Sequence, residues 1–195
     1  MSASSLLITF LLLSSTMPAM TQQPQLEGQI KQLLLNEEPV DLKTELRRLG
    51  NDDEIATLLM QLASDNRSAV VRSQRLIILD GAVSALGQIR ATSANDLLSS
   101  LLTDQKVQRN VRAGAARSLG QIDPERNKEI LLRALDQTSD FYLIRVYAAE
   151  GLAKTRDAKA LKALERYGRE EKDAYVRQKF ENGAQAMRAN GVKPN

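Results

Sequence analysis

The sequence predicts an all-α fold, an α-solenoid in which antiparallel helix pairs stack side by side. Two observations support this fold class. A pattern of small and apolar residues returns after 33 positions in the middle of the chain, and aromatic residues make up only 4% of the sequence, with no Trp and no Cys. Packing must therefore rest on Leu, Ile, Val and Ala, and Ala and Leu have strong helix propensity.

The repeat is clearest in two copies of one segment. Leu86-Gly87-Gln88-Ile89 returns as Leu119-Gly120-Gln121-Ile122, and Gly81 and Gly114 are also 33 positions apart. Helix periodicity alone does not explain this return, because glycine and glutamine recur together with the apolar residues. A unit of this length cannot bury its own apolar face, so neighbouring units must cover each other and form an elongated molecule.

The first 20 residues differ from the rest of the chain. No charged side chain occurs before Glu27, and Leu6 to Leu13 is an apolar run broken only by Thr9. A run of about 8 apolar residues suits a signal peptide, whereas a membrane span needs about 20. The sequence therefore predicts a signal peptide at 1–20 and an exported protein, periplasmic or secreted. An uncleaved membrane anchor and a structural helix remain as alternatives.

Four further segments are expected after the signal peptide. Residues 21–25 form a polar linker, 26–65 an N-terminal helical cap that hides the open end of the core, 66–190 the repeats and 191–195 a frayed tail. In the cap, Asp41 begins a helix that Gly50 ends, and another helix starts at Asp52. The stretch 66–89 is either one long helix or two helices joined near Arg72.

Helices in the repeats follow from apolar spacing and start signals. Asp123 followed by Pro124 combines a helix cap with proline at the first helical position. Thr138 to Asp140 is expected to be a turn. Besides the helix that starts at Pro124, the predicted helices are 95–102, 109–122, 142–155, 157–167 and 174–187.

The second helix of each pair carries a family resemblance. Val111-Arg112, Ala115-Ala116 and Leu119-Gly120, with the copy Ile144-Arg145 and Ala148-Ala149, resemble HEAT-like repeats of the short type also found in phycobilisome lyases. The resemblance covers about Leu76 to Met187 and implies a right-handed HEAT-like or armadillo-type superhelix. It implies no activity, because this repeat occurs in scaffolds, lyase subunits and some DNA-repair glycosylases.

The resemblance also implies a structural role for a row of arginines. In the family, the arginine after the apolar residue joins a ladder with an aspartate from the preceding turn. The first copy departs from this pattern, because Leu79 stands where arginine is expected. The expected ladder consists of Arg112, Arg145 and Arg177 with the acids Asp140 and Asp173.

A polar row on the second helices is the candidate binding site. In this family the second helices line the concave side of the superhelix. The side of the helix turned away from Val111, Ala115 and Leu119 also includes Ala113 and, one unit later, Val146. An ordinary solvated face is the alternative interpretation. The candidate partner-binding residues are Ser84, Gln88, Arg109, Arg117, Gln121, Tyr142, Glu150 and Lys154.

Enzymatic chemistry has little support in this sequence. With no His and no Cys, the usual bases, thiolate nucleophiles and zinc ligands are missing. Adjacent carboxylates such as Glu170 and Glu171 point about 100° apart on a helix and cannot act as a pair. We therefore predict no catalytic residues, no metal and no cofactor, and a scaffold that binds a protein or peptide on its concave face.

Two other functions stay open at the level of sequence. Similarity to the lyases allows a subunit that holds a small molecule or chromophore, with a pocket near Tyr142 and Tyr147. The charge distribution also allows nucleic-acid binding. Residues 27–65 hold 4 basic and 9 acidic residues, a net charge of −5, whereas residues 66–195 hold 23 basic and 15 acidic residues, a net charge of +8. The charges are interspersed, which disfavours nucleic acid. The four tyrosines between Tyr142 and Tyr175 suit either recognition or packing.

Overall fold

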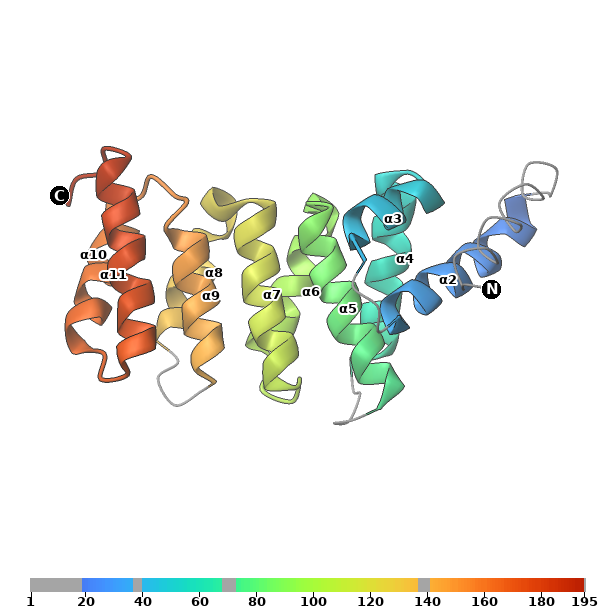
Figure 1. Cartoon of the computed structure of the whole chain (residues 1–195), viewed down its shortest axis with the longest axis horizontal. Coiled ribbons are helices and arrows are strands. Elements are labelled where there is room, and N and C mark those ends of the chain that lie inside the picture. Colours follow the sequence, from blue (N-terminus) through green and yellow to red (C-terminus); the bar gives the residue numbers. More distant parts are fainter. Residues whose placement is uncertain (1–18, 37–39, 68–72, 137–140, 195) are drawn as a thin grey trace.

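The computed structural model describes residues 19–36, 40–67, 73–136 and 141–194, and these residues form helices without any strand among them (Figure 1). A short 3-10 turn, Thr92–Ala94, precedes α6. The α-helices are α2 (Ala19–Leu35), α3 (Leu42–Leu49), α4 (Asp52–Asp65), α5 (Gln74–Gln88), α6 (Asn95–Thr103), α7 (Arg109–Ile122), α8 (Pro124–Leu135), α9 (Tyr142–Leu152), α10 (Ala158–Glu170) and α11 (Ala174–Ala189).

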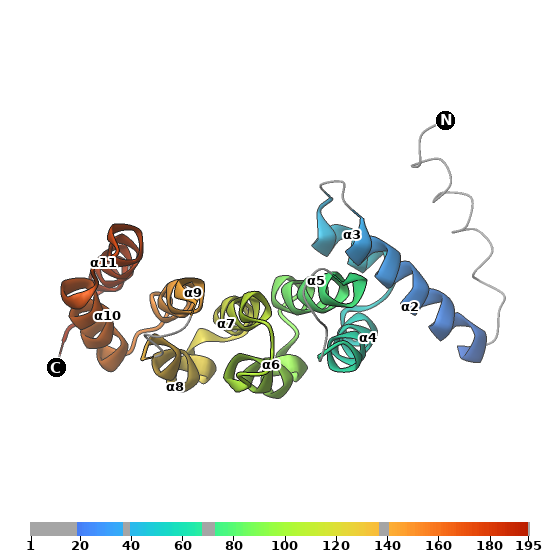
Figure 2. The same ribbon diagram turned by 90° about the horizontal axis from the view of Figure 1, so that it is seen from below.

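The helices are arranged in two layers along one axis. Figure 2 shows α4, α6, α8 and α10 in one layer and α5, α7, α9 and α11 in the other. We call these the first and the second helices. The row bends so that the second helices lie on its concave side, with α2 and α3 at the N-terminal end and α11 at the other. The predicted all-α solenoid is confirmed.

Short polar side chains start most of these helices at the predicted places. The Asp41 and Asp123 carboxylates accept hydrogen bonds from the backbone N–H groups of Thr44 and Arg126. Such caps satisfy N–H groups that have no partner inside the helix. Asn51, Ser73, Asp157 and Asp173 cap their helices in the same way. The cap at Ser73 starts α5, so the stretch 66–89 is not one long helix.

Successive second helices touch through small residues. A Cβ atom added to Gly87 would lie 2.5 Å from the Ser118 Oγ atom, and one added to Gly120 would lie 2.7 Å from the Cα atom of Gly151. Because Ser118 and Gly151 are 33 residues apart, as are Gly87 and Gly120, the same two positions meet at both junctions. The backbones of neighbouring units are thus in direct contact, which leaves no room for a side chain.

The last unit has an aromatic ring at a position where the preceding unit has alanine. Phe180 aligns with Ala148 of the preceding unit, is fully buried, and has its ring centroid 5.8 Å from that of Tyr167. The contact between Ala153 and Gly183 is looser than the glycine contacts, since a Cβ atom on Gly183 would lie 3.4 Å from the Ala153 Cβ atom. The aromatic pair, from α10 and α11, lies inside the last unit, where the Arg145 guanidinium of α9 contacts both rings.

Two predicted segment boundaries are wrong. The expected linker at 21–25 lies inside α2, where Leu26, Ile30 and Leu34 are buried. This helix packs on the repeats: a Cβ atom on Gly81 of α5 would lie 3.1 Å from a methyl group of Leu34. The helix that buries these leucines and Ile30 thus also includes the polar residues 21–25 before them.

The start of the predicted frayed tail is also ordered. Gly191 has φ = 82°, and the N–H groups of Gly191 and Val192 donate to the carbonyls of Arg188 and Met187. This is the Schellman motif, which glycine favours at a helix C-terminus. Val192 is buried as a result.

We predict that Gly120→Ala destabilises the protein by about 1–3 kcal/mol, because its methyl group must displace the backbone of α9. Urea unfolding followed by circular dichroism measures the change. Gly28→Ala is the matched control: a Cβ atom there meets nothing within 4 Å, and alanine should stabilise the middle of α2 by about 0.5–1 kcal/mol. A Gly120→Ala variant as stable as wild type would contradict the proposed backbone contact.

Candidate functional site

The concave surface, defined as the accessible side of α5, α7, α9 and α11 with the turn after α9, holds the predicted binding residues. Arg109, Arg117, Tyr142 and Lys154 are exposed. The side chains of Ser84, Gln88, Gln121 and Glu150 are partly buried between helices.

Two residues predicted to face away from the core are in fact buried. Ala113 and Val146 are each 1% exposed, because the second helices pack so closely that they cover each other's flanks. Their successors Gly114 and Tyr147 are more accessible. The open face is therefore narrower than the helical wheel of one isolated helix indicates.

Two exposed arginines of α7 stack on aromatic rings of the next unit. The Arg109 guanidinium carbon lies 5.2 Å from the centroid of the Phe141 ring, and that of Arg117 lies 5.4 Å from the centroid of the Tyr147 ring. Cations at these distances are attracted by the ring quadrupole. The contacts hold both arginine side chains toward α9.

An aromatic ridge, consisting of Phe141, Tyr142 and Tyr175, continues from Arg109 to α11. The ring centroids of Phe141 and Tyr142 are 5.3 Å apart and those of Tyr142 and Tyr175 are 6.2 Å apart, both in edge-to-face geometry. Tyr142 is 46% exposed and Tyr175 is 51% exposed. Large, rigid and accessible tyrosines of this kind are typical of protein-binding surfaces.

A lysine of α11 extends the surface beyond the predicted residues. The Lys179 Nζ atom lies 3.1 Å from a Glu150 carboxylate oxygen and 5.5 Å from the centroid of the Tyr175 ring. The bond to Glu150 raises the pKa of Lys179. The predicted partner-binding residues included neither Tyr175 nor Lys179; the sequence indicated only that Tyr175, with the other three tyrosines, suits either recognition or packing.

The remaining predicted residues make local contacts. The Gln88 side-chain amide donates to the Ser84 hydroxyl at 3.3 Å, and the Lys154 Nζ atom donates to the Gly120 carbonyl at 3.2 Å. Tyr142 contacts Tyr175, whereas Tyr147 contacts Arg117. These two tyrosines, expected to wall a single small-molecule pocket, thus have different neighbours.

Among the described residues, two arginines of the expected ladder donate to groups other than aspartate. Arg112 donates to the Leu102 carbonyl and to Gln105, and Arg177 donates to the Glu171 carbonyl. Asp173 caps α11, where it accepts from the N–H groups of Tyr175 and Val176. Asp140 lies outside the described residues.

The third arginine forms a buried ion pair with an acid that the sequence did not indicate. Arg145 and Glu171 are 2.6 Å apart, with side chains only 11% and 12% exposed. The Arg145 guanidinium also lies over the Phe180 ring, 5.2 Å from its centroid. Desolvation favours a higher pKa for Glu171, but its bonds from the Asp173 N–H group and from Arg145 outweigh this effect and lower the pKa. Arg145 is thus held in the interior, with Glu171 as its partner.

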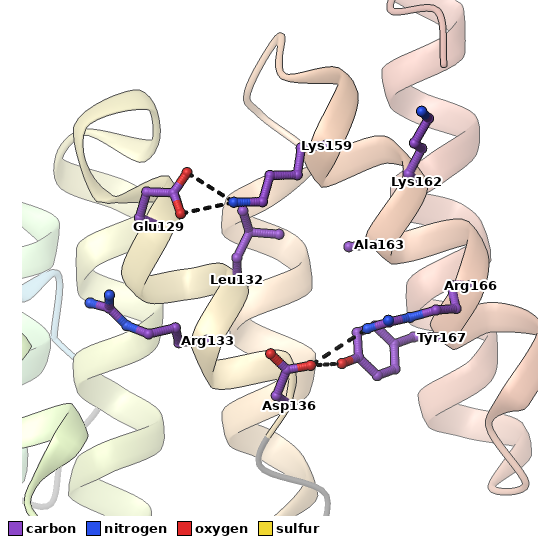
Figure 3. A pocket seen from close by; sticks show the side chains of 9 residues that line it. All are labelled: Glu129, Leu132, Arg133, Asp136, Lys159, Lys162, Ala163, Arg166 and Tyr167. Atoms are coloured by element: carbon purple, nitrogen blue, oxygen red, sulfur yellow. Dashed lines mark hydrogen bonds and ion pairs between the residues drawn. The ribbon is translucent and has the colours of Figure 1, made fainter. Parts of the chain in front are cut away.

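A pocket of about 330 Å³ lies on the opposite, outer side, between α8 and α10 (Figure 3). Leu132, Ala163 and the Tyr167 ring provide its apolar surface. Two ion pairs cross it, from Glu129 to Lys159 at 3.1 Å and from Asp136 to Arg166 at 3.5 Å, and the Tyr167 hydroxyl donates to Asp136.

These pairs connect α8 to α10. Burial and the bond to Asp136 raise the pKa of Tyr167. Figure 3 shows Arg133 and Lys162 pointing away from the centre of the pocket, so the basic side chains around it do not converge on one point.

Within the described part of the chain, no group of carboxylates is arranged to hold a metal ion. The same residues include no helix long and apolar enough to cross a membrane.

We predict that Glu171→Gln lowers the free energy of unfolding by about 3 kcal/mol, because Arg145 would lose its charged partner in the interior. Since the pKa of Glu171 is lowered in the folded state, the contribution exists above the unfolded-state pKa of about 4.3 and disappears as the pH falls. The loss on substitution should therefore shrink in acid, as urea unfolding at several pH values would measure.

Glu129→Gln is the control for this substitution. It breaks the ion pair between Glu129 and Lys159, in which the two side chains are 57% and 68% exposed. The free energy of unfolding should therefore change by less than about 1 kcal/mol. Equal effects of the two substitutions would contradict a special role for the buried pair.

Comparison with known protein families agrees with this architecture. A family model described as HEAT repeats matches residues 77–146 and 108–183. Together the matches extend from residue 77 to residue 183, more than half of the 195-residue chain, and from α5 to α11. No significant match was found among curated proteins. The predicted resemblance is thus confirmed, and the chain belongs to the HEAT-repeat family.

Proposed function

We propose that this protein is a non-catalytic scaffold that binds a partner protein or peptide along its concave surface. The observation that carries the proposal is the aromatic ridge, with Tyr142 and Tyr175 half-exposed beside the ring-stacked Arg109. Tyrosine and arginine are among the residue types that most often dominate the energy of protein interfaces.

The side chains of the concave surface are held in place by their neighbours, which supports this function. The arginines are held against rings and the tyrosines against each other, so fewer side-chain rotamers would be lost on binding. Each immobilised side chain otherwise costs about 0.5–1.5 kcal/mol. A surface ordered before binding therefore favours affinity.

The size of the surface suits a peptide or one face of a small domain. Four second helices spaced by about 10 Å extend over about 30 Å, and a helix as long as α7, with 14 residues, measures about 21 Å. With the width of the helices at both ends included, the surface measures about 40 Å by about 21 Å, or about 800 Å², which is comparable to the area that each partner buries in a standard interface.

We predict that the double variant Arg117→Glu, Glu150→Arg loses partner capture while its melting temperature changes little, because Arg117 is exposed and the Glu150–Lys179 ion pair is partly solvated and worth at most about 1 kcal/mol. The measurement is crosslinking pull-down of the tagged chain from its native compartment, followed by quantitative mass spectrometry. The charge exchange leaves the net charge unaltered.

The matched control exchanges an ion pair of the outer side, Glu129→Lys with Lys159→Glu. Proteins retained by wild type and by this control, but absent from the concave variant, are the expected result. Partners captured equally by all three chains would refute binding through the concave surface.

We further propose that the protein is exported. The apolar run Leu6 to Leu13, together with the absence of charged side chains before Glu27, supports this localisation. Fractionation of cells that express the C-terminally tagged chain, with mass spectrometry of its N-terminus, tests it. We expect a mature N-terminus near Ala19 to Thr21 outside the cytoplasm, whereas a chain that keeps Met1 in the cytoplasmic fraction would exclude export.

A further inference from the structure

The two ring-stacked arginines of α7 differ in their partners from three basic residues of the outer side. Neither Arg109 nor Arg117 has a carboxylate within salt-bridge distance among the described residues. On the outer side, Lys128, Lys159 and Arg166 pair with Asp157, Glu129 and Asp136. The concave arginines are thus ordered by rings while their charge stays uncompensated.

Stacking leaves the hydrogen-bonding capacity of an arginine available. An aromatic ring occupies one face of the planar guanidinium, whereas its five N–H groups point outward in the plane and fit a carboxylate. Arg109 and Arg117 are eight positions apart on α7, which corresponds to about 12 Å along the helix axis. Their ring partners, Phe141 and Tyr147, both belong to the next unit, so both arginines point to the same side of α7.

The surroundings add positive charge and an apolar anchor. Glu150 of α9 is paired with Lys179, and Lys154 adds one more cation at the end of the strip, whereas Asp80 adjoins Gly114 on the α5 side of α7. Beyond Arg109, the half-exposed rings of Tyr142 and Tyr175 offer an apolar contact. The strip therefore complements a chain that carries acidic and apolar side chains together.

We infer that the concave surface recognises an extended acidic peptide segment, with one carboxylate on Arg109, a second on Arg117 and an apolar side chain against Tyr142 and Tyr175. The inference rests on the proposed function and specifies the chemical class of the partner. In an extended chain, side chains four positions apart project to the same side and are separated by about 13 Å, which matches the spacing of the two arginines.

A nucleic acid fits this surface less well, although phosphate also binds arginine. Asp80 of α5 and the Lys179-paired Glu150 of α9 interrupt the positive charge on either side of the α7 arginines. A peptide with two separate carboxylates can contact the arginines alone, whereas a nucleic acid carries a phosphate at every nucleotide. Nucleic-acid binding also needs cations along a continuous track, whereas this strip offers separate ones.

The test uses the full chain and a fluorescent, blocked peptide with two glutamates four residues apart, a proline between them and a leucine beyond the first. The proline keeps the probe extended. Fluorescence anisotropy should show saturable binding that Arg117→Gln weakens by about 10-fold, the effect of one lost charge-assisted bond. Replacing both glutamates with glutamine should weaken binding to wild type by at least as much.

A double-mutant cycle assigns the contact. If one glutamate binds Arg117, the Arg117→Gln variant should no longer discriminate between glutamate and glutamine at that peptide position. Arg133→Gln is the matched control, because it removes the same charge from an exposed arginine of the outer side, and it should bind the probe like wild type.

Every other result overturns the inference. Absence of saturable binding, equal affinity for the glutamine peptide, or tighter binding of a single-stranded oligonucleotide than of the acidic peptide would each exclude acidic-peptide recognition. The proposed function can survive that outcome, because capture of partners that depends on Arg117 and Glu150 would still identify the concave surface. Loss of that dependence would remove both.

Discussion

Gly87, Gly120 and Gly151 let successive second helices approach until their backbones touch, and most other features of the molecule depend on this contact. At Gly120 the next Cα atom occupies the place of a side chain. With the helices so close, alanines and leucines of adjacent units suffice to fill the space between them, and the core contains no tryptophan and no disulfide. The Ser118 hydroxyl, buried at the same junction, is satisfied by the Val83 carbonyl at 2.8 Å.

Close packing also determines the chemistry of the concave surface. The flanks of the second helices cover each other and bury Ala113 and Val146, so each helix presents only a narrow strip. Side chains of neighbouring strips then lie near enough for Arg117 to reach Tyr147 and for Tyr142 to reach Tyr175. A looser solenoid would let water separate these groups. The ordered array of rings and cations is thus a consequence of small residues in the core.

The last unit uses a different solution. A bulky ring, Phe180, stands where earlier units have alanine, and the buried Arg145 and Glu171 lie around it. On the outer side, ion pairs between α8 and α10 bridge the pocket that separates these helices. The Schellman motif at Gly191 then ends α11 and buries Val192. Charge and aromatic rings thus supplement a looser small-residue contact, that of Ala153 with Gly183, in the last unit.

The amino-acid sequence by itself determined the repeat, the helical class and most helix starts, because these follow from local signals. Glycine and alanine spacing revealed the stacked units, and capping residues such as Asp123 before Pro124 fixed helix boundaries within a few residues. The candidate row also included the concave arginines Arg109 and Arg117. Each of these features can be recognised within one repeat unit or from the recurrence of its pattern 33 residues later.

Only the tertiary structure decided which side chains meet across units. The pairing of Arg145 with Glu171, and the inclusion of Tyr175 and Lys179 in the concave surface, depend on the distance and tilt between neighbouring helices. A helical wheel assigned Ala113 to the open face because it treats each helix alone. Residues 21–25 likewise belong to α2, which packs on α5 through Leu34. Contacts between helices depend on geometry that no single unit specifies.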